Sequence, residues 1–94
     1  MKLLTKEILN RIPASSEDSD DPVIHVKFFT PDSSWTWYAT EYDPETEMFF
    51  GLVDGLDREL GYFSLAELKS ARGPLGLPIE RDMHFDPRPL SEIA

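Results

Sequence analysis

The chain has 94 residues, no cysteine and a formal net charge of −9. This length predicts a single domain over residues 1–94, and the lack of cysteine favours a cytoplasmic location, because small secreted domains usually depend on disulfides. Binding to nucleic-acid backbones or to anionic membranes needs clustered Lys and Arg, which the chain lacks, so we expect neither a nucleic acid nor a membrane as a direct partner. The N-terminal run carries charges and no cleavage site, and no apolar run approaches the ~20 residues of a membrane span.

The first third of the chain predicts a short helix followed by a loop. Residues 3–12 place apolar side chains on one stripe, Thr5 is a candidate N-cap, and Pro13 ends the helix. Residues 13–22 are polar and acidic without an apolar anchor, which indicates a mobile acidic loop. The aspartates of this loop lack the turn glycine and distal glutamate of a calcium loop, so we assign no metal ligand there.

Four strands are expected next, at residues 23–30, 34–43, 48–53 and 59–63. The second holds both tryptophans and alternates at period two, which is typical of a central strand. Its pattern places Trp35, Trp37, Ala39 and Glu41 on one face and Thr36, Tyr38, Thr40 and Tyr42 on the other. The third strand is apolar on both faces, so we expect both of its faces to be covered. Gly51 within it predicts a bulge or the close approach of a large ring, with a tryptophan as the expected ring, and Gly61 offers similar room for Trp37.

Ser64 and Glu67 form a capping box, which predicts a second helix from about residue 65 to residue 71. Gly73 and Pro74 end that helix, a rigid connector follows, and residues 79–85 form a last extended segment. Short polar turns favour antiparallel neighbours. We therefore predict an α+β fold, with an antiparallel meander sheet of four to five strands, a short N-terminal helix and a second helix after strand four.

Motifs of catalysis are not found in the sequence. The chain has no cysteine, no serine elbow, no phosphate loop, and only two histidines without partners at zinc-ligand spacing. Carboxylate pairs at i, i+2, such as Glu41 with Asp43 and Glu80 with Asp82, are expected by chance on a wet face of so acidic a chain. We therefore assign no catalytic, cofactor-binding or metal-binding residue, and we expect no cofactor.

Acidic and aromatic side chains occur together in the middle of the chain. Residues 41–59 carry seven acids against Arg58 alone. Exposed Trp and Tyr are enriched in protein interfaces. We therefore interpret the chain as a non-enzymatic interaction module whose partner is a protein, with a basic protein as one form of it. The expected surface comprises Trp35, Tyr38, Glu41, Tyr42, Asp43, Glu80, Arg81 and Asp82.

Other functions stay open at this point. A small enzyme or small-ligand binder would use a pocket near Trp35, Glu41, Glu80, Arg81 and Asp82. An acidic mimic of DNA that occupies a basic DNA-binding protein is a special case of the interaction module. A base-stacking platform on the aromatic strand is a third alternative, although such platforms lie in positively charged grooves. The oligomeric state is also open, because an unpaired edge strand could pair two chains.

Several motifs resemble a known family. They are Trp35-Thr36-Trp37-Tyr38, Asp43-Pro44, Phe49-Phe50-Gly51-Leu52-Val53, Leu60-Gly61-Tyr62-Phe63-Ser64-Leu65, and the run from Gly73 to Asp82. Together they resemble a small bacterial family known as a domain of unknown function, often encoded on plasmids and other mobile elements. The resemblance spans roughly Phe28 to Pro89, and the loop at 14–22 is particular to this sequence. It implies a bacterial, cytoplasmic, stand-alone domain, and it implies no catalytic residue.

Overall fold

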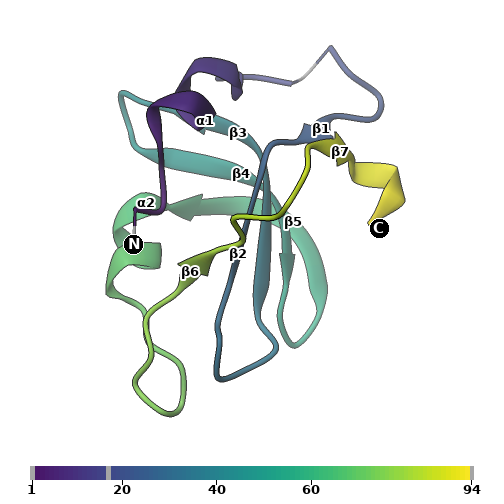
Figure 1. Cartoon of the computed structure of the whole chain (residues 1–94). Coiled ribbons are helices and arrows are strands. Elements are labelled where there is room, and N and C mark those ends of the chain that lie inside the picture. The colour runs from purple at the N-terminus through teal and green to yellow at the C-terminus, as the bar shows by residue number, and fades with distance from the viewer. Residues whose placement is uncertain (1, 17, 94) are drawn as a thin grey trace.

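The computed structural model describes residues 2–16 and 18–93, so Glu17 of the predicted acidic loop lies outside the described residues. In chain order the elements are α1 (Lys6–Arg11), β1 (Val23–Ile24), β2 (Val26–Phe29), β3 (Thr36–Asp43), β4 (Met48–Asp54), β5 (Arg58–Ser64), α2 (Leu65–Ser70), β6 (Glu80–Arg81), β7 (Arg88–Pro89) and a 3-10 turn at Leu90–Glu92 (Figure 1). Five strands form an antiparallel sheet in the order β5-β4-β3-β2-β6. The predicted antiparallel sheet is confirmed, and the α+β class fits.

The sheet is built mainly from consecutive hairpins. β3 is the middle strand, as its aromatic alternation predicts, and β4 lies between β3 and β5. Phe49 of β4 is buried on one face of the sheet and Leu52 on the other, so both faces of this strand are covered at these positions. The turn from β3 to β4 is closed by a hydrogen bond from the Glu47 N–H to the Asp43 carbonyl (2.8 Å).

Both helices begin at a side-chain cap. The Thr5 hydroxyl accepts a hydrogen bond from the Ile8 N–H (3.2 Å), and the Ser64 hydroxyl accepts one from the Glu67 N–H (2.9 Å). Each helix has only six residues, too few to be stable without packing. Within the described residues, no helix is long and apolar enough to cross a membrane.

Two hydrophobic clusters cover the two faces of the sheet. The first includes side chains of both helices, and the second is closed by the C-terminal segment. The first cluster comprises Leu3, Ile8, Ile12, Val26, Phe28, Ala39, Tyr42, Phe49, Phe63, Leu65, Leu68 and Ile79, with Trp37 half-buried against it. The second comprises Ile24, Tyr38 and Leu52, with Phe85, Leu90 and Ile93 packed on them.

The predicted strand at residues 23–30 is divided at His25. β1 pairs with β7, whereas β2 pairs with β3 and β6. The predicted extended segment at residues 79–85 is also shorter, because the Asp82 carboxylate accepts the His84 N–H (2.9 Å) and turns the chain after β6. The first difference accompanies pairing with the C-terminal strand β7, which local alternation does not encode, and the second comes from the local turn at Asp82.

A β-bulge at Thr40 corrects the predicted environment of Gly51. Ala39 pairs with Gly51 and Glu41 with Phe50, so Thr40 is the extra residue; its buried hydroxyl donates to the Phe50 carbonyl (3.2 Å). A Cβ on Gly51 would overlap the backbone carbonyl of Tyr38, so the close approach is made by backbone and not by a ring.

The tryptophan ring lies at another glycine. A Cβ on Gly55 would overlap the Trp35 ring, whereas a Cβ on Gly61 would meet nothing within 4 Å. The prediction that Gly51 and Gly61 make room for large rings is therefore wrong. Trp37 is half-buried through its packing on the first cluster, not through space above these two glycines.

The predicted acidic loop is hydrogen-bonded to β3 and to the C-terminal turn. The Glu41 carboxylate accepts hydrogen bonds from the N–H and hydroxyl of Ser16 (2.6 and 2.5 Å). The Asp21 carboxylate accepts from the N–H and hydroxyl of Ser91 (2.9 and 2.6 Å). These bonds tie the two ends of the loop to β3 and to the C-terminal turn. Its mobility stays a prediction.

Candidate functional site

The eight residues of the predicted surface do not lie together. Trp35 precedes β3 and Asp43 ends it, a separation of about 26 Å at ~3.3 Å per residue. Glu80, Arg81 and Asp82 lie at one edge of the sheet, on β6 and directly after it, and β2 separates them from β3. The surface therefore consists of separate regions, and the involvement of each in binding stays a prediction.

The aromatic members of that surface differ in their exposure. Trp35 is 38% exposed, whereas Tyr38 and Tyr42 are 9% and 5% exposed. The bulge at Thr40 changes which face the residues after it occupy, so Tyr38 packs in the second cluster and Tyr42 in the first. Of these three rings, Trp35 alone offers much of its surface to a partner.

Glu41 and Asp43 line a hollow that we call the acidic groove. Its volume is about 270 Å³, and its lining consists of Ala14, Ser15, Glu41, Asp43, Thr46, Met48, Phe50 and Tyr62. The Phe50 and Tyr62 rings meet edge to face with centroids 4.9 Å apart. Tyr62 is 73% exposed, which leaves most of its ring open to solvent.

Sequence reasoning assigned neither Phe50 nor Tyr62 to the site. Their signal was the register of the β4–β5 hairpin, which pairs Phe50 with Tyr62. The bulge then pairs Glu41 with Phe50, so the three side chains follow one row across the sheet. Without the bulge, period-two alternation places Glu41 on the face of Trp37.

The acidic groove carries a negative potential. Among the described residues that line it, none is basic. The Glu41 carboxylate is held by Ser16, and the Asp43 carboxylate accepts the Glu45 N–H (2.9 Å). Burial raises the pKa of the neighbouring Tyr42, and the carboxylates of Glu47 and Asp43 raise it further. The carboxylates of Glu41 and Asp43, together with the rings of Phe50 and Tyr62, suit the binding of a cationic side chain.

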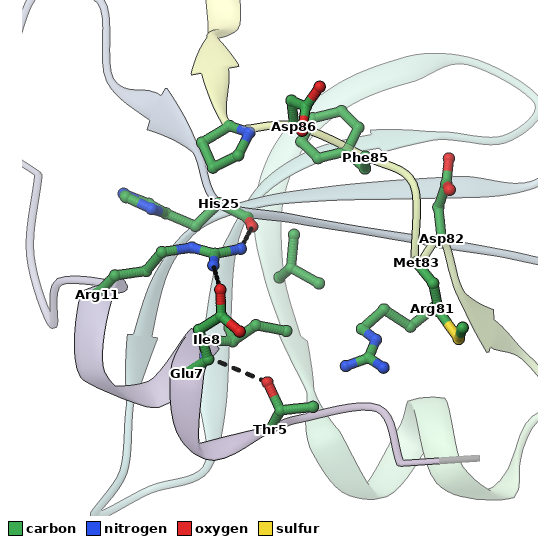
Figure 2. A pocket seen from close by; sticks show the side chains of 12 residues that line it. Thr5, Glu7, Ile8, Arg11, His25, Arg81, Asp82, Met83, Phe85 and Asp86 are labelled. Carbon is green, nitrogen blue, oxygen red and sulfur yellow. Dashed lines mark hydrogen bonds and ion pairs between the residues drawn. The ribbon is translucent and has the colours of Figure 1, made fainter.

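A second hollow, the α1 cavity, lies between α1 and the chain that follows β6 (Figure 2). Its volume is about 380 Å³, and its lining consists of Thr5, Glu7, Ile8, Arg11, His25, Val26, Arg81, Asp82, Met83, Phe85, Asp86 and Pro87. Arg11 donates to the Glu7 carboxylate (3.3 Å) and to the His25 carbonyl (2.9 Å). Figure 2 shows the Arg81 guanidinium directed toward Thr5 and Ile8.

The His25 ring points away from Arg81 (Figure 2). Its Nδ1 is buried, and no hydrogen-bond partner is found for it among the described residues. Burial lowers the pKa of His25, and the charge of Arg11 lowers it further. His25 is therefore biased toward its neutral form.

Glu80 lies outside the α1 cavity and lines a third, more open hollow. This hollow has a volume of about 440 Å³ and also contains Arg81, Asp82, Lys27 and Phe29. Lys27 Nζ lies 3.8 Å from an Asp82 carboxylate oxygen, an ion pair between half-buried side chains. Trp35 and Glu41 line neither this hollow nor the α1 cavity. These two hollows therefore do not bring Trp35 and Glu41 together with Glu80, Arg81 and Asp82, as the sequence predicted.

Within the described chain, no group of three or more His, Asp or Glu side chains is placed so that it could hold a metal ion. Carboxylates, guanidinium groups and exposed rings are what the hollows present. These groups bind charged side chains and small ions through ion pairs and stacking.

Comparison with known proteins gives one match. Neither the search of curated proteins nor the search of solved structures found a match. A family model described as "Protein of unknown function (DUF2958)" matches residues 2–94, and this match also includes the loop at 14–22. The resemblance seen in the sequence motifs is thereby confirmed as far as a domain of unknown function. The chain belongs to the DUF2958 family of proteins of unknown function.

Proposed function

We propose that the protein is a non-enzymatic interaction module that binds a protein partner through the acidic groove. The observation that carries this proposal is the combination of two fixed carboxylates, Glu41 and Asp43, with the open face of Tyr62. The partner accordingly presents Lys or Arg side chains. A cation over an exposed aromatic ring contributes about 0.5–1 kcal/mol, and more when it is desolvated.

The overall charge of the chain supports a basic partner. A net charge of −9 steers a basic surface toward the protein and repels acidic ones. Seven of the acids lie within residues 41–59, the segment that contributes most of the groove. Binding by this mechanism weakens as salt concentration rises, because exposed charges are screened over about 10 Å at 0.1 M salt.

The test compares two variants of equal charge. Glu41→Lys with Asp43→Lys alters the groove, and Asp20→Lys with Glu92→Lys makes the same change in net charge at exposed positions outside it. A partner captured from a bacterial lysate is purified, and its Kd is measured for the wild type and both variants at two salt concentrations. We expect a much larger loss of affinity in the groove variant. Equal losses, or no partner at all, would refute the proposal.

The α1 cavity supports a second candidate, the binding of a small anionic ligand. Its volume of about 380 Å³ lies within the range of about 300–1,000 Å³ usual for ligand sites. Arg11 and Arg81 line it beside the carboxylates of Glu7, Asp82 and Asp86, and guanidinium groups recognise carboxylates and phosphates. A thermal-shift screen with small carboxylates and phosphates tests this candidate. An increase in Tm that disappears in Arg81→Gln supports it, and a screen without any increase contradicts it.

We also propose a bacterial, cytoplasmic setting on a plasmid or other mobile element. The resemblance of the sequence motifs and the lack of cysteine support it. In that setting an acidic mimic of DNA is one form of the interaction module. A captured partner that releases a DNA fragment when the protein is added would support the mimic, and a partner without affinity for DNA would exclude it.

A further inference from the structure

β5 forms a free edge of the sheet, since β4 is its partner on one side and no described strand pairs with its other side. The Leu65 N–H donates to the Glu47 carbonyl (3.0 Å), and this bond establishes which residues of β5 hydrogen-bond to β4. In an antiparallel pair, residues that face the partner strand alternate with residues that face away. Gly61 and Phe63 therefore bond to β4, and the N–H and C=O groups of Leu60 and Tyr62 point away from the sheet.

The side chains along this edge are also open. Leu60 and Tyr62 are 58% and 73% exposed and lie on the face of the acidic groove. Gly61 lies on the other face, with nothing within 4 Å of its Cβ position. The opposite edge strand, β6, has only two residues. Proteins usually protect long edges with charged residues, proline or a bulge; β5 has charges only at its start, at Arg58 and Glu59, and its other five residues contain none of these.

The edge and the acidic groove share Tyr62. A strand added to β5 would lie about 4.8 Å from it, and its side chains would alternate between the two faces. The residue beside Tyr62 would extend over the ring toward Phe50 and the carboxylates of the groove, which favours Lys or Arg there. Two positions further along, the residue beside Leu60 would meet an apolar side chain.

We propose that β5 is a strand-addition site for an extended segment of a basic partner protein, in which a Lys or Arg and an apolar residue are separated by one position. This inference rests on the proposed function and names how the partner binds. Backbone hydrogen bonds at Leu60 and Tyr62 supply affinity, and the acidic groove selects the basic side chain. A second copy of the chain is disfavoured as the occupant, because pairing two chains of −9 places like charges together.

The probe is a short capped peptide with Val, Arg and Val at alternate positions separated by Thr. Its control has the same composition with Arg moved by one position, which places Arg on the other face. Hydrogen exchange of single amides is followed by NMR in the full chain. We expect exchange at Leu60 and Tyr62 to slow more than about tenfold with the peptide, while Gly61 and Phe63 change little.

A pair of variants tests the edge itself. Tyr62→Lys adds a positive charge on β5, and Leu56→Lys adds the same charge at a 92% exposed turn position outside the strand. We expect Tyr62→Lys to weaken peptide binding more than about tenfold and Leu56→Lys to leave it within about twofold. Because both side chains are exposed, neither variant disturbs the core.

The outcomes separate this inference from the function on which it rests. In one outcome the peptide binds the wild type but not the Glu41→Lys, Asp43→Lys variant, and exchange at Leu60 and Tyr62 does not change when it binds. That outcome refutes strand addition and retains the basic partner. If exchange at these two amides slows as the concentration of the free protein is raised, a second copy of the chain is the occupant and the inference is overturned. If the protein binds neither peptide and no basic partner, both the strand-addition site and the proposed function are refuted.

Discussion

Gly51 and Gly61 face each other across β4 and β5, so the same change to Ala at each position tests the bulge in β3. Ala is normally about 0.5–1 kcal/mol better than Gly inside a strand, because Gly loses more conformational freedom on folding. At Gly61 a Cβ meets nothing within 4 Å, so Gly61→Ala is expected to raise the free energy of unfolding by that amount.

At Gly51 the same Cβ overlaps the Tyr38 carbonyl oxygen and approaches the Ala39 Cα. These are backbone atoms, which cannot rotate aside, so the cost lies near the upper end of the ~1–3 kcal/mol typical of overpacking. After the normal gain from Ala, we expect Gly51→Ala to lower the free energy of unfolding by about 2 kcal/mol. At about 4–8 °C per kcal/mol, the Tm falls by about 8–16 °C.

Urea unfolding followed by tryptophan fluorescence measures both variants, and an unchanged m-value shows that the extent of unfolding is the same. A third measurement separates backbone contact from ring contact. If a Trp37 ring filled the space at Gly51, then Trp37→Leu would relieve the cost of Gly51→Ala, whereas overlap with Tyr38 predicts additive losses. Stability equal to wild type in Gly51→Ala, or relief by Trp37→Leu, would refute the bulge geometry.

Three further changes test the core, a helix cap and a titrating group. Phe49→Ala removes a fully buried ring and should cost about 3–5 kcal/mol in urea unfolding. Tyr62→Ala at the surface loses mainly the ring contact with Phe50 and should cost no more than about 1.5 kcal/mol, so similar losses in the two variants would contradict this packing. Ser64→Ala removes the cap of α2 and should cost about 0.5–2 kcal/mol, and Ser64→Thr should restore most of it. The folded-state pKa of His25 is lowered from 6.5 by burial and by Arg11. The unfolded chain therefore takes up a proton first as pH falls below about 6.5, and stability decreases from there down to the folded pKa. His25→Gln should show a shallower decrease between these limits, and an identical slope would show that His25 does not titrate differently in the two states.

Much of the sheet could be predicted because its signals are local. Aromatic alternation identifies β3, and the Asp54–Gly55 turn joins β4 to β5. The pairing of β1 with β7 could not be predicted, because it joins segments more than sixty residues apart and each strand has only two residues. Such short strands carry too little periodicity to be recognised.

The candidate site depends on one residue that periodicity cannot reveal. Up to Ala39 the alternation in β3 predicts the faces correctly, and beyond Thr40 it predicts the opposite of what is found. One extra residue moves every later side chain to the opposite face of the sheet, because side chains alternate between the faces with a period of two. That inversion takes Tyr42 into the first cluster and brings Glu41 into line with Phe50 and Tyr62. The acidic groove is thus a consequence of the bulge, and the bulge in turn requires a glycine at position 51. Loss of the groove in Gly51→Ala would therefore accompany its loss of stability, and peptide affinity measured under folding conditions should fall with it.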